Sequence, residues 1–526
     1  MIEDPITFEV IKNALISCAR EMSQSLRRTA FSPNIKERRD CSCAIFDDNG
    51  HLIAQSKDIP VHLGAMPLSV RSCIEILEDE LIEDSMALVN NPFLGGSHLP
   101  DLTLVAPIFS EGERVAFTAN RAHHADIGGE TPGSMPGLSL SIHDEGVLVE
   151  PRIIVTDGKL QLVKIKDILD ATRTPDERIG DLSAQIAANH VGRIRLDQIA
   201  QIHRWETLLR TFTDLKAYSA QMMTNKLQFH ENQYGEFTDY LDSDGAGNWN
   251  IPIRVSVKIK DGRANVDFTG TSNQVTGNVN CPLASTLSSV YYVFITLFGQ
   301  NIPINEGCWS VIDVNVPAGS LLNPKYPAPV SAGNVETSQR IVDTILGALS
   351  KILLNLVPAA SQGTMNNLTI GGIDSRSGRA FSFYETIGGG SGACNGKNGV
   401  SAIHTHMTNT LNTPIESLES EYPLRVKNYA IRRGTGGLGK WSGGDGVLRE
   451  IELLSERSTV SIQSERRLLA PWGIAGGLEG VKGRNRVVYQ NEEHELQSKT
   501  IIVVPKDAII CIETPGGGGW GPPQPE

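Results

Sequence analysis

Two short segments of this chain combine residue types that bind metal ions or move protons. The segment GGSHLPD contains His98 and Asp101, and the segment RAHHAD contains His123, His124 and Asp126. Glycine and proline residues surround both segments, so packing in an apolar core does not account for these side chains. Two imidazoles and a carboxylate are a common ligand set for zinc, manganese or iron. Together the two segments indicate a metal site.

The expected metal ligands are His98, Asp101 and His123, and Asp40, at the end of the segment KERRD, can add a second carboxylate. Nitrogen and oxygen ligands without thiolate are typical of a catalytic site, in which an open position lets the metal lower the pKa of a bound water. The alternative is that these residues form hydrogen bonds that fix turns. The His-x-x-Asp spacing alone does not decide between the two interpretations.

His124 and Asp126 are the candidate catalytic residues. They lie close enough in the sequence to the expected ligands to orient them through hydrogen bonds, or to carry protons to and from the site. The same alternative, a role in fixing turns, applies to both.

Two runs of strand-forming residues must position these side chains. LTLVAPIF (102–109) and RVAFTAN (114–120) are joined by the turn residues SEGE. GGSHLPD leads into the first run and RAHHAD follows the second. Because a hairpin brings the outer ends of its strands together, we expect His98 and Asp101 to approach His123.

The rest of the chain predicts an α+β fold with several domains. The patterns predict a helix over 5–30, a hairpin over 41–56 that turns at Asn49-Gly50, a helix over 66–81, mostly helices over 165–236, and strands from 247 onward, interrupted by one long buried helix over 338–357. We therefore expect three regions: an N-terminal mixed α/β region with the metal site (1–164), a helical region (165–245) and a β-rich C-terminal region (246–526).

Composition excludes some classes of function. A net charge of −13 over 526 residues argues against binding to nucleic acid. The segment MIEDPITFEVIKNAL lacks the apolar core of a signal peptide, and the most apolar later run, RIVDTILGALSKILLNLVPAA, is interrupted by charged residues, so we expect neither an export signal nor a membrane span. Eight cysteines without a CxxC pair suit a reduced, cytoplasmic protein. Cys41 and Cys43 are expected to point to one face of a strand.

Glycine-rich segments raise the question of phosphate binding. GTGGLGK (434–440) matches the first seven positions of a phosphate-binding loop. However, Trp441 stands where that loop needs Ser or Thr, and the following SGGDG would break the helix that such a loop opens. We therefore expect a glycine-rich turn there, and no ATP site in this chain. The clusters at 388–392 and 516–519 are interpreted either as close-packing loops or as loops that face a substrate.

Four longer motifs resemble those of the hydantoinase B/oxoprolinase family. They are NNPFLGGSHLPDLTLVAPIF, ANRAHHADIGGETPGSMPG, GNVNCPLAST and TPGGGGWG. They occur in the same order as in that family, and the resemblance covers essentially the whole chain. The family comprises the B-type components of N-methylhydantoinase, 5-oxoprolinase and caprolactamase systems, with relatives in acetone and acetophenone carboxylases.

The resemblance implies a division of labour between two kinds of chain. An A-type partner uses ATP to activate a cyclic amide, and the B-type chain completes ring opening with one divalent metal (zinc, manganese or iron). The family's metal ligands correspond to His98, Asp101 and His123, with Asp40 as a further ligand, and the choice of His123 over His124 rests on this match. We expect a cytoplasmic hetero-oligomer built on dimers, with neither nucleic acid nor membrane as a partner. Two alternatives remain open: a component of an ATP-dependent ketone carboxylase, and a noncatalytic scaffold for the A-type partner.

Overall fold

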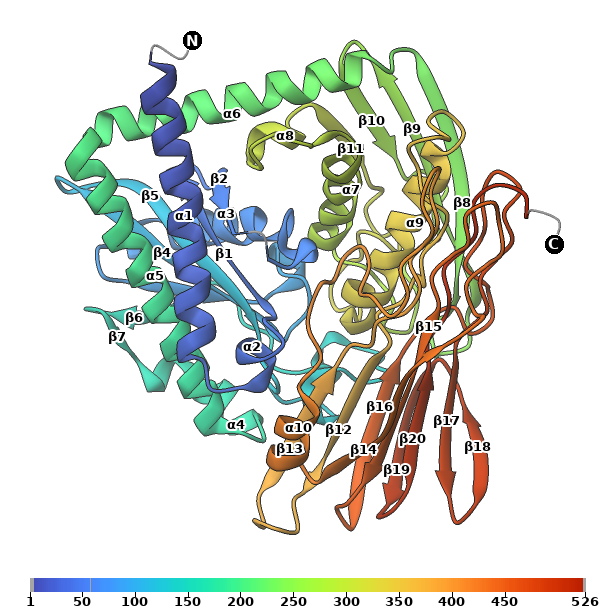
Figure 1. Cartoon of the computed structure of the whole chain (residues 1–526). Coiled ribbons are helices and arrows are strands. Elements are labelled where there is room, and N and C mark those ends of the chain that lie inside the picture. The colour runs from blue at the N-terminus through green and yellow to red at the C-terminus, as the bar shows by residue number, and fades with distance from the viewer. Residues whose placement is uncertain (1–3, 57, 524–526) are drawn as a thin grey trace.

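A seven-stranded antiparallel sheet forms the N-terminal part of the molecule (Figure 1). The structure is a computed structural model that describes residues 4–56 and 58–523. The strand order β2-β1-β5-β4-β3-β6-β7 places the predicted hairpin strands β5 and β4 in the centre of the sheet. The strands are β1 (Cys41–Asp47), β2 (Leu52–Gln55), β3 (Met86–Val89), β4 (Asp101–Ser110), β5 (Glu113–His123), β6 (Arg152–Thr156) and β7 (Lys159–Leu160). Both predicted N-terminal hairpins are confirmed.

Helices cover both faces of this sheet. On one face, α1, α5 and α6 share an apolar core with Cys41 and Cys43. This confirms that the two sulfurs point to the same face of the strand. On the other face, α3 packs against the sheet. Asp4 caps α1, because its carboxylate accepts a hydrogen bond from the backbone N–H of Ile6 at 2.9 Å. The helices are α1 (Pro5–Thr29), α2 (Pro33–Lys36), α3 (Ala65–Leu77), α4 (Lys166–Ala171), α5 (Pro175–His203) and α6 (Trp205–Gln228). The helices predicted near the N-terminus are therefore confirmed.

The second sheet begins inside the region predicted to be helical. Its order is β11-β10-β9-β8, and β8 pairs with β9 as a hairpin across residue 245. The strands are β8 (Gln233–Ser243), β9 (Trp249–Lys260), β10 (Arg263–Asp267) and β11 (Ile312–Asn315). The helical region is thus shorter than 165–245. The sequence of β8, QYGEFTDYLDS, has too few apolar residues to reveal a strand by alternation, and its pairing with β9 supplies the stability that its composition lacks. The division into three domains stays a prediction.

A second long buried helix, α7, lies beside α9 in the described part of the C-terminal region. α9 packs on β8 and β9, and α7 packs against α9 and α3. The prediction of a single helix over 338–357 is therefore wrong, and α9 also ends earlier, at Leu349. The run LASTLSSVYYVFITLF of α7 is rich in β-branched and aromatic residues, which favour strands, but its buried position stabilises the helix. The helices are α7 (Leu283–Phe298), α8 (Glu306–Trp309), α9 (Ser338–Leu349) and α10 (Ile415–Glu421).

The last part of the chain forms two further sheets that share one apolar core. Their orders are β13-β12-β16-β19 and β14-β15-β20-β17-β18, and both lie at the lower right of Figure 1. Their strands are β12 (Asn367–Ile373), β13 (Ala380–Glu385), β14 (Leu424–Arg432), β15 (Gly446–Leu453), β16 (Arg457–Gln463), β17 (Arg484–Tyr489), β18 (Glu492–Leu496), β19 (Lys499–Pro505) and β20 (Ile509–Glu513). The predicted β-rich character of this region is confirmed.

The glycine-rich segments pack against one another, backbone to backbone. Gly437 N–H donates to the carbonyl of Gly517 at 2.8 Å, and Gly517 N–H donates to that of Gly444 at 2.9 Å. A Cβ atom added to Gly517 would lie 2.0 Å from the carbonyl oxygen of Ser391, and one added to Gly390 would lie 1.9 Å from that of Gly444. No helix follows residues 434–440 in the chain up to residue 523. This segment is therefore the glycine-rich turn that the sequence predicts. The clusters at 388–392 and 516–519 are close-packing loops.

Replacing Gly517 with alanine should destabilise the protein by about 3 kcal/mol, because the added methyl group forces neighbouring backbone apart. Gly434→Ala is the matched control. An added Cβ there meets no atom within 4 Å, so only its left-handed backbone (φ 79°) is penalised, by about 1 kcal/mol. Denaturant unfolding measures both changes. Equal losses of unfolding free energy in the two variants would contradict the close packing of these loops.

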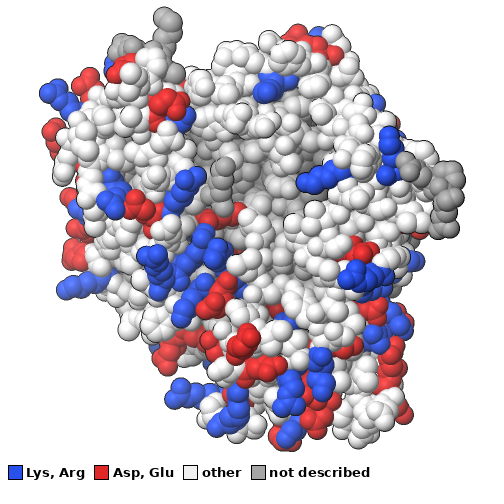
Figure 2. Space-filling model, in the orientation of Figure 1, with Lys and Arg blue, Asp and Glu red and all other residues white. Residues whose placement is uncertain are grey.

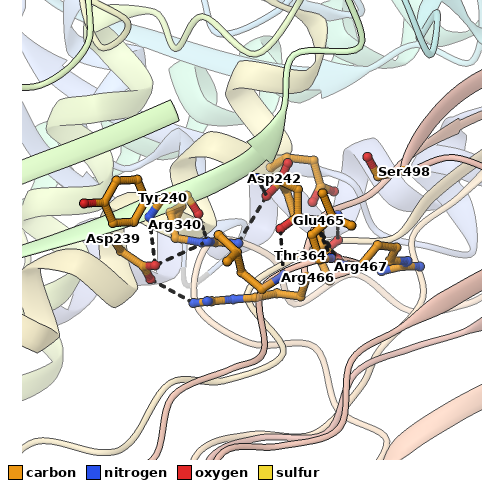
Figure 3. A network of polar contacts seen from close by, with 12 residues as sticks. Asp239, Tyr240, Asp242, Arg340, Thr364, Glu465, Arg466, Arg467 and Ser498 are labelled. Atoms are coloured by element: carbon orange, nitrogen blue, oxygen red, sulfur yellow. Dashed lines mark hydrogen bonds and ion pairs between the residues drawn. The ribbon is translucent and has the colours of Figure 1, made fainter. Parts of the chain in front are cut away.

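A buried network of charged side chains fixes α9 to β8 and to the loop after β16 (Figure 3). Arg340 of α9 donates from Nη2 to Glu465 Oε2 at 3.2 Å. Arg466 donates from Nη2 to Asp343 Oδ2 at 2.7 Å and to Asp239 Oδ2 at 3.0 Å. All five residues are buried. Because buried charges are costly unless they are paired, this network holds the start of α9 in one position.

One face of the molecule is hollowed. Figure 2 shows that uncharged residues dominate the hollow in the upper middle of this face, whereas acidic and basic side chains intermingle on the lower half. A pocket of about 870 Å³ is lined by residues of α1, β2 and α7 and by the segment 299–304. In the part of the chain that the structure describes, no helix is both long and apolar enough to cross a membrane.

Candidate metal centre

The register of the central strands brings three predicted ligands to one end of the sheet. Asp101 is the first residue of β4 and lies directly opposite His123, the last residue of β5. Cys41 of β1 lies opposite Ala122 of β5, so Asp40 reaches the same end. The backbone N–H of His123 also donates to the backbone carbonyl of Asp40 at 3.0 Å. The approach of His98 and Asp101 to His123, expected from the hairpin, is confirmed.

Two glycines allow the loop before β4 to bring His98 into place. Gly95 has a positive φ of 91°, and a Cβ atom on Gly96 would lie 2.1 Å from the carbonyl oxygen of Asn90. The backbone N–H of Asp101 donates to the carbonyl of His98 at 3.1 Å, which closes a turn over the His-x-x-Asp segment. This turn places the two side chains on the same side of the loop.

His98, Asp101 and His123 form a tight, buried cluster. One ligand atom from each lies within 4.8 Å of the others, and the three residues are at most 2% exposed. Asp101 Oδ2 lies 3.3 Å from His98 Nε2. Both ring nitrogens of His98, Nε2 of His123 and Oδ1 of Asp101 are buried without a hydrogen-bond partner among the described residues. Such orphaned polar atoms are costly, and a bound cation would satisfy them.

Burial is the largest influence on the pKa values in this cluster. It raises the pKa of Asp40 and lowers the pKa of His123 well below its ordinary value. Burial also acts to raise the pKa of Asp101, but the rings of His98 and His62 outweigh it and hold that pKa well below the usual range. Neutral imidazole and ionised carboxylate are the forms in which His and Asp bind metals.

The cluster lines a cavity of about 20 Å³, which has room for about one water molecule. Asp40 also lines it but is not in the cluster, so the structure brings three of the predicted ligands into close contact and the fourth to the same cavity. The remaining lining residues come from distant parts of the chain and are mostly apolar or uncharged: Ile59, Val61, His62, Asn334, Val335, Met365, Tyr384, Thr386, Met407 and Thr408. Ile59 lines both this cavity and the 870 Å³ pocket, so the two spaces adjoin.

His62 is a site residue that the sequence analysis missed. It lies in a short 3₁₀ helix (Pro60–His62), and its Nε2 is 3.6 Å from Asp101 Oδ2. Its Nδ1 is 2.8 Å from the hydroxyl of Ser42, which lines the larger pocket. His62 therefore connects the two spaces. No spacing rule relates this lone histidine to the His-x-x-Asp segment, so the sequence offered no signal for it.

Asn34 and Tyr384 hold the ring of His123. The side-chain amide of Asn34 lies 2.9 Å from Nδ1, which leaves Nε2 as the ring nitrogen that faces the other ligands. Tyr384 stacks on the ring with a centroid distance of 4.7 Å. Arg38 in turn donates to Asn34 Oδ1 at 2.6 Å and lies over the Tyr384 ring.

His124 and Asp126 contact neither the cavity nor the ligands through their side chains. Successive side chains at a strand end alternate in direction, and His124 Nε2 therefore lies 2.9 Å from Gln185 Oε1 of α5. Asp126 accepts hydrogen bonds from the backbone N–H of Gly128 and from Arg173, both at 3.0 Å. Asp126 thus fixes a turn, and His124 links the end of β5 to α5. A catalytic role for His124 or Asp126 stays a prediction without a contact to support it.

Replacing Asn34 with alanine should weaken metal binding by about 10–100-fold, because the ring of His123 loses the contact that orients it. Asn189→Ala is the matched control. Asn189 is equally buried but donates to the carbonyl of Leu104, away from the cavity. Competition with a metal-binding dye measures the affinity of each variant. Equal affinities for Asn34→Ala and wild type would show that Asn34 does not position the ligand.

Comparison with known proteins identifies the family. Residues 4–523 match the family described as hydantoinase B/oxoprolinase. The chain belongs to this family. The 5-oxoprolinase of Dictyostelium discoideum is 40% identical over 98% of the chain, which spans 40% of the length of that relative. A protein of a Pseudomonas species, named as the putative B component of a D-/L-hydantoinase, is 33% identical over 99% of the chain and 90% of its own length. Membership in the family expected from the motifs is confirmed.

Solved structures of the same fold exist. The ATP-dependent caprolactamase of Pseudomonas jessenii superposes with a TM-score of 0.92 at 25% identity, over 99% of this chain and 92% of its own. An acetone carboxylase described as ATP-dependent superposes with a TM-score of 0.91 at 17% identity, over 99% of this chain and 76% of its own. The second likeness shows a shared fold. The mixed α/β architecture with several sheets is therefore shared with the caprolactamase.

Proposed function

We propose that the chain is the metal-dependent B-type component of an ATP-coupled cyclic-amide hydrolase, which completes ring opening after an A-type partner has activated the substrate. The buried cluster of His98, Asp101 and His123 carries this proposal, because its orphaned ligand atoms have no other hydrogen-bond partners among the described residues. The names of the relatives, a 5-oxoprolinase, a hydantoinase component and a caprolactamase, support the substrate class.

The residues present fit a divalent metal. Two imidazole nitrogens and the carboxylates of Asp101 and Asp40 would hold zinc, manganese or iron, and a cavity with room for about one water leaves an open position. When bound, such a metal lowers the pKa of water and polarises a carbonyl oxygen. A cation would also offset the cost of burying the carboxylates of Asp40 and Asp101 in one cavity.

The other lining residues serve the same reaction. The apolar side chains of Ile59, Val61 and Met407 exclude bulk water from the ligands. His62, in contact with Ser42 on the side of the large pocket, orients Asp101 from outside the ligand cluster. The large pocket is the route by which a substrate would approach, since it adjoins the cavity at Ile59.

The A-type partner is part of this proposal. One relative is named as the B component of a hydantoinase, and the caprolactamase is described as ATP-dependent. The one phosphate-loop-like segment of the sequence forms a close-packed turn, so ATP would be used by the partner. A cytoplasmic hetero-oligomer built on dimers is the assembly we expect.

A component of a ketone carboxylase is the second candidate, supported by the shared fold with acetone carboxylase. The test mixes the chain with an A-type hydantoinase partner and supplies hydantoin, 5-oxoproline or ε-caprolactam with ATP, or acetone with ATP and bicarbonate. ATP-dependent ring opening supports the hydrolase. If product forms only in the mixture of acetone, ATP and bicarbonate, and from none of the cyclic amides, the carboxylase is selected. Full turnover by a variant that lacks both His98 and His123 would leave only the scaffold role.

A further inference from the structure

Asn334 brings an amide to the cavity from a part of the chain that carries no predicted ligand. It lies in a π-helical turn (Gly333–Thr337) directly before α9, and it lines the cavity together with Val335. π-helical turns are rare, and they occur frequently at functional sites. Asn334 is 2% exposed, so bulk water has little access to its polar atoms.

The contacts of Asn334 leave its side-chain N–H₂ group free. Ser285 of α7 donates from its hydroxyl to Asn334 Oδ1 at 2.7 Å. The other end of the amide, Nδ2, has no hydrogen-bond partner among the described residues and is not fully buried, and Asn334 lines the cavity. Because Ser285 holds the oxygen, the N–H₂ group is the end presented to a ligand. Asn334 is only 2% exposed and lines the cavity, so its free N–H₂ group is placed to donate to a ligand held there.

The surrounding backbone holds this turn rigidly. The N–H groups of Ala332 and Gly333 both donate to the carbonyl of Asn278 at 3.0 Å, and Thr337 donates from Oγ1 to the carbonyl of Val279 at 2.6 Å. A Cβ atom on Gly333 would lie 1.7 Å from the carbonyl oxygen of Asn280. The motif GNVNCPLAST thus supplies both the platform under the turn and Ser285. The buried ion network fixes α9 behind it (Figure 3).

The lining around Asn334 suits an uncharged ring. Among the described residues, no lysine or arginine lines the cavity, and five apolar residues do: Ile59, Val61, Val335, Met365 and Met407. The space of about 20 Å³ must widen to take a ring, and the two methionines are the most adaptable of these side chains.

We propose that Asn334 is a substrate-binding residue whose Nδ2 donates a hydrogen bond to the ring carbonyl oxygen of the cyclic amide. This rests on the proposed function. The donor lies in the same small cavity as the ligand cluster, and it supports the oxygen as negative charge develops on it. Ser285 is the positioning residue that keeps Nδ2, and not Oδ1, turned to the substrate.

The test measures binding of three probes, δ-valerolactam, hydantoin and 5-oxoproline, to the manganese- or zinc-loaded chain by calorimetry. Asn334→Ala removes the donor, and Asn334→Asp replaces it with an acceptor of the same size. For every probe that wild type binds, we expect both variants to bind at least about 10-fold more weakly. Their metal content should be at least equal to that of wild type.

Ser285→Ala and Ser289→Ala form a matched pair on α7. Ser289 donates to the backbone carbonyls of Ser285 and Ser338 and forms no hydrogen bond with Asn334 among the described residues. We expect about 3-fold weaker binding for Ser285→Ala, which lets the amide turn, and unchanged binding for Ser289→Ala.

Two results would overturn the proposal. The first is wild-type affinity for all probes in both folded, metal-loaded Asn334 variants. The second is failure of the metal-loaded wild-type chain to bind any of the three rings. Failure of the proposed function is distinguishable, because a wild-type chain that takes up no metal would refute the metal centre before any probe is added.

Discussion

Replacing His98 with alanine should abolish metal binding and lower turnover with the A-type partner at least about 1000-fold. His98 contributes a nearly fully buried ring, neither of whose nitrogens has a hydrogen-bond partner among the described residues, and its Nε2 lies 3.3 Å from Asp101. Loss of one of so few ligands leaves too small a set to hold a metal. Elemental analysis of the purified variant, beside His123→Ala, measures the effect directly.

Thermal unfolding gives a second measurement of the same prediction. A metal that binds only the folded chain stabilises it, so added zinc or manganese should raise the Tm of wild type and leave that of His98→Ala unchanged. His404→Ala is the control, because its ring nitrogens are also buried without hydrogen-bond partners among the described residues but lie outside the cavity. It should lose stability and keep its metal. Equal metal content in His98→Ala and wild type would refute the centre.

Replacing Arg466 with methionine should destabilise the protein by about 3–5 kcal/mol. Arg466 pairs with Asp239 and Asp343, and all three are buried, so its loss leaves two carboxylates in a space with little water (Figure 3). Burial acts to raise the pKa of Asp343, yet His406 and the guanidinium of Arg466 hold it below the ordinary value. Urea unfolding, followed by circular dichroism, measures the change.

An exposed pair of the same chemistry is the control for Arg466. Arg263 donates to Asp313 at 2.9 Å on the surface of the second sheet, where water screens the charges. Arg263→Met should cost no more than about 1 kcal/mol. In the Arg466→Met background, Asp343→Asn should recover part of the lost stability, because it removes a buried charge that has lost its arginine partner. Additive losses in that double variant would mean that the two residues do not interact.

Local patterns were enough to predict the ligand cluster but not the cavity around it. The hairpin formed by β4 and β5 has its turn and both strands within one short stretch, so its outer ends, and with them Asp101 and His123, were predictable. His62 and Asn334 carry no such signal. Each reaches the cavity only because α3, α7 and α9 pack between the sheets.

The errors in the predicted elements have a common cause. α7 has the composition of a strand and β8 lacks the alternation of one, and in both cases neighbours decide the outcome. α7 is helical because it is buried against α9, and β8 is a strand because β9 pairs with it along its length. Neither neighbour is visible in a short window of sequence.

The sequence by itself determined the family, the four candidate ligands and the hairpin that aligns three of them, because these depend on residue types and short-range spacing. Only the tertiary structure decided that the side chains of His124 and Asp126 point away from the cavity. It also decided that the glycine-rich loops pack on one another and that Asn334 lines the cavity with its Oδ1 held by Ser285. Side-chain direction and burial depend on how distant segments pack, and that packing is a property of the whole chain.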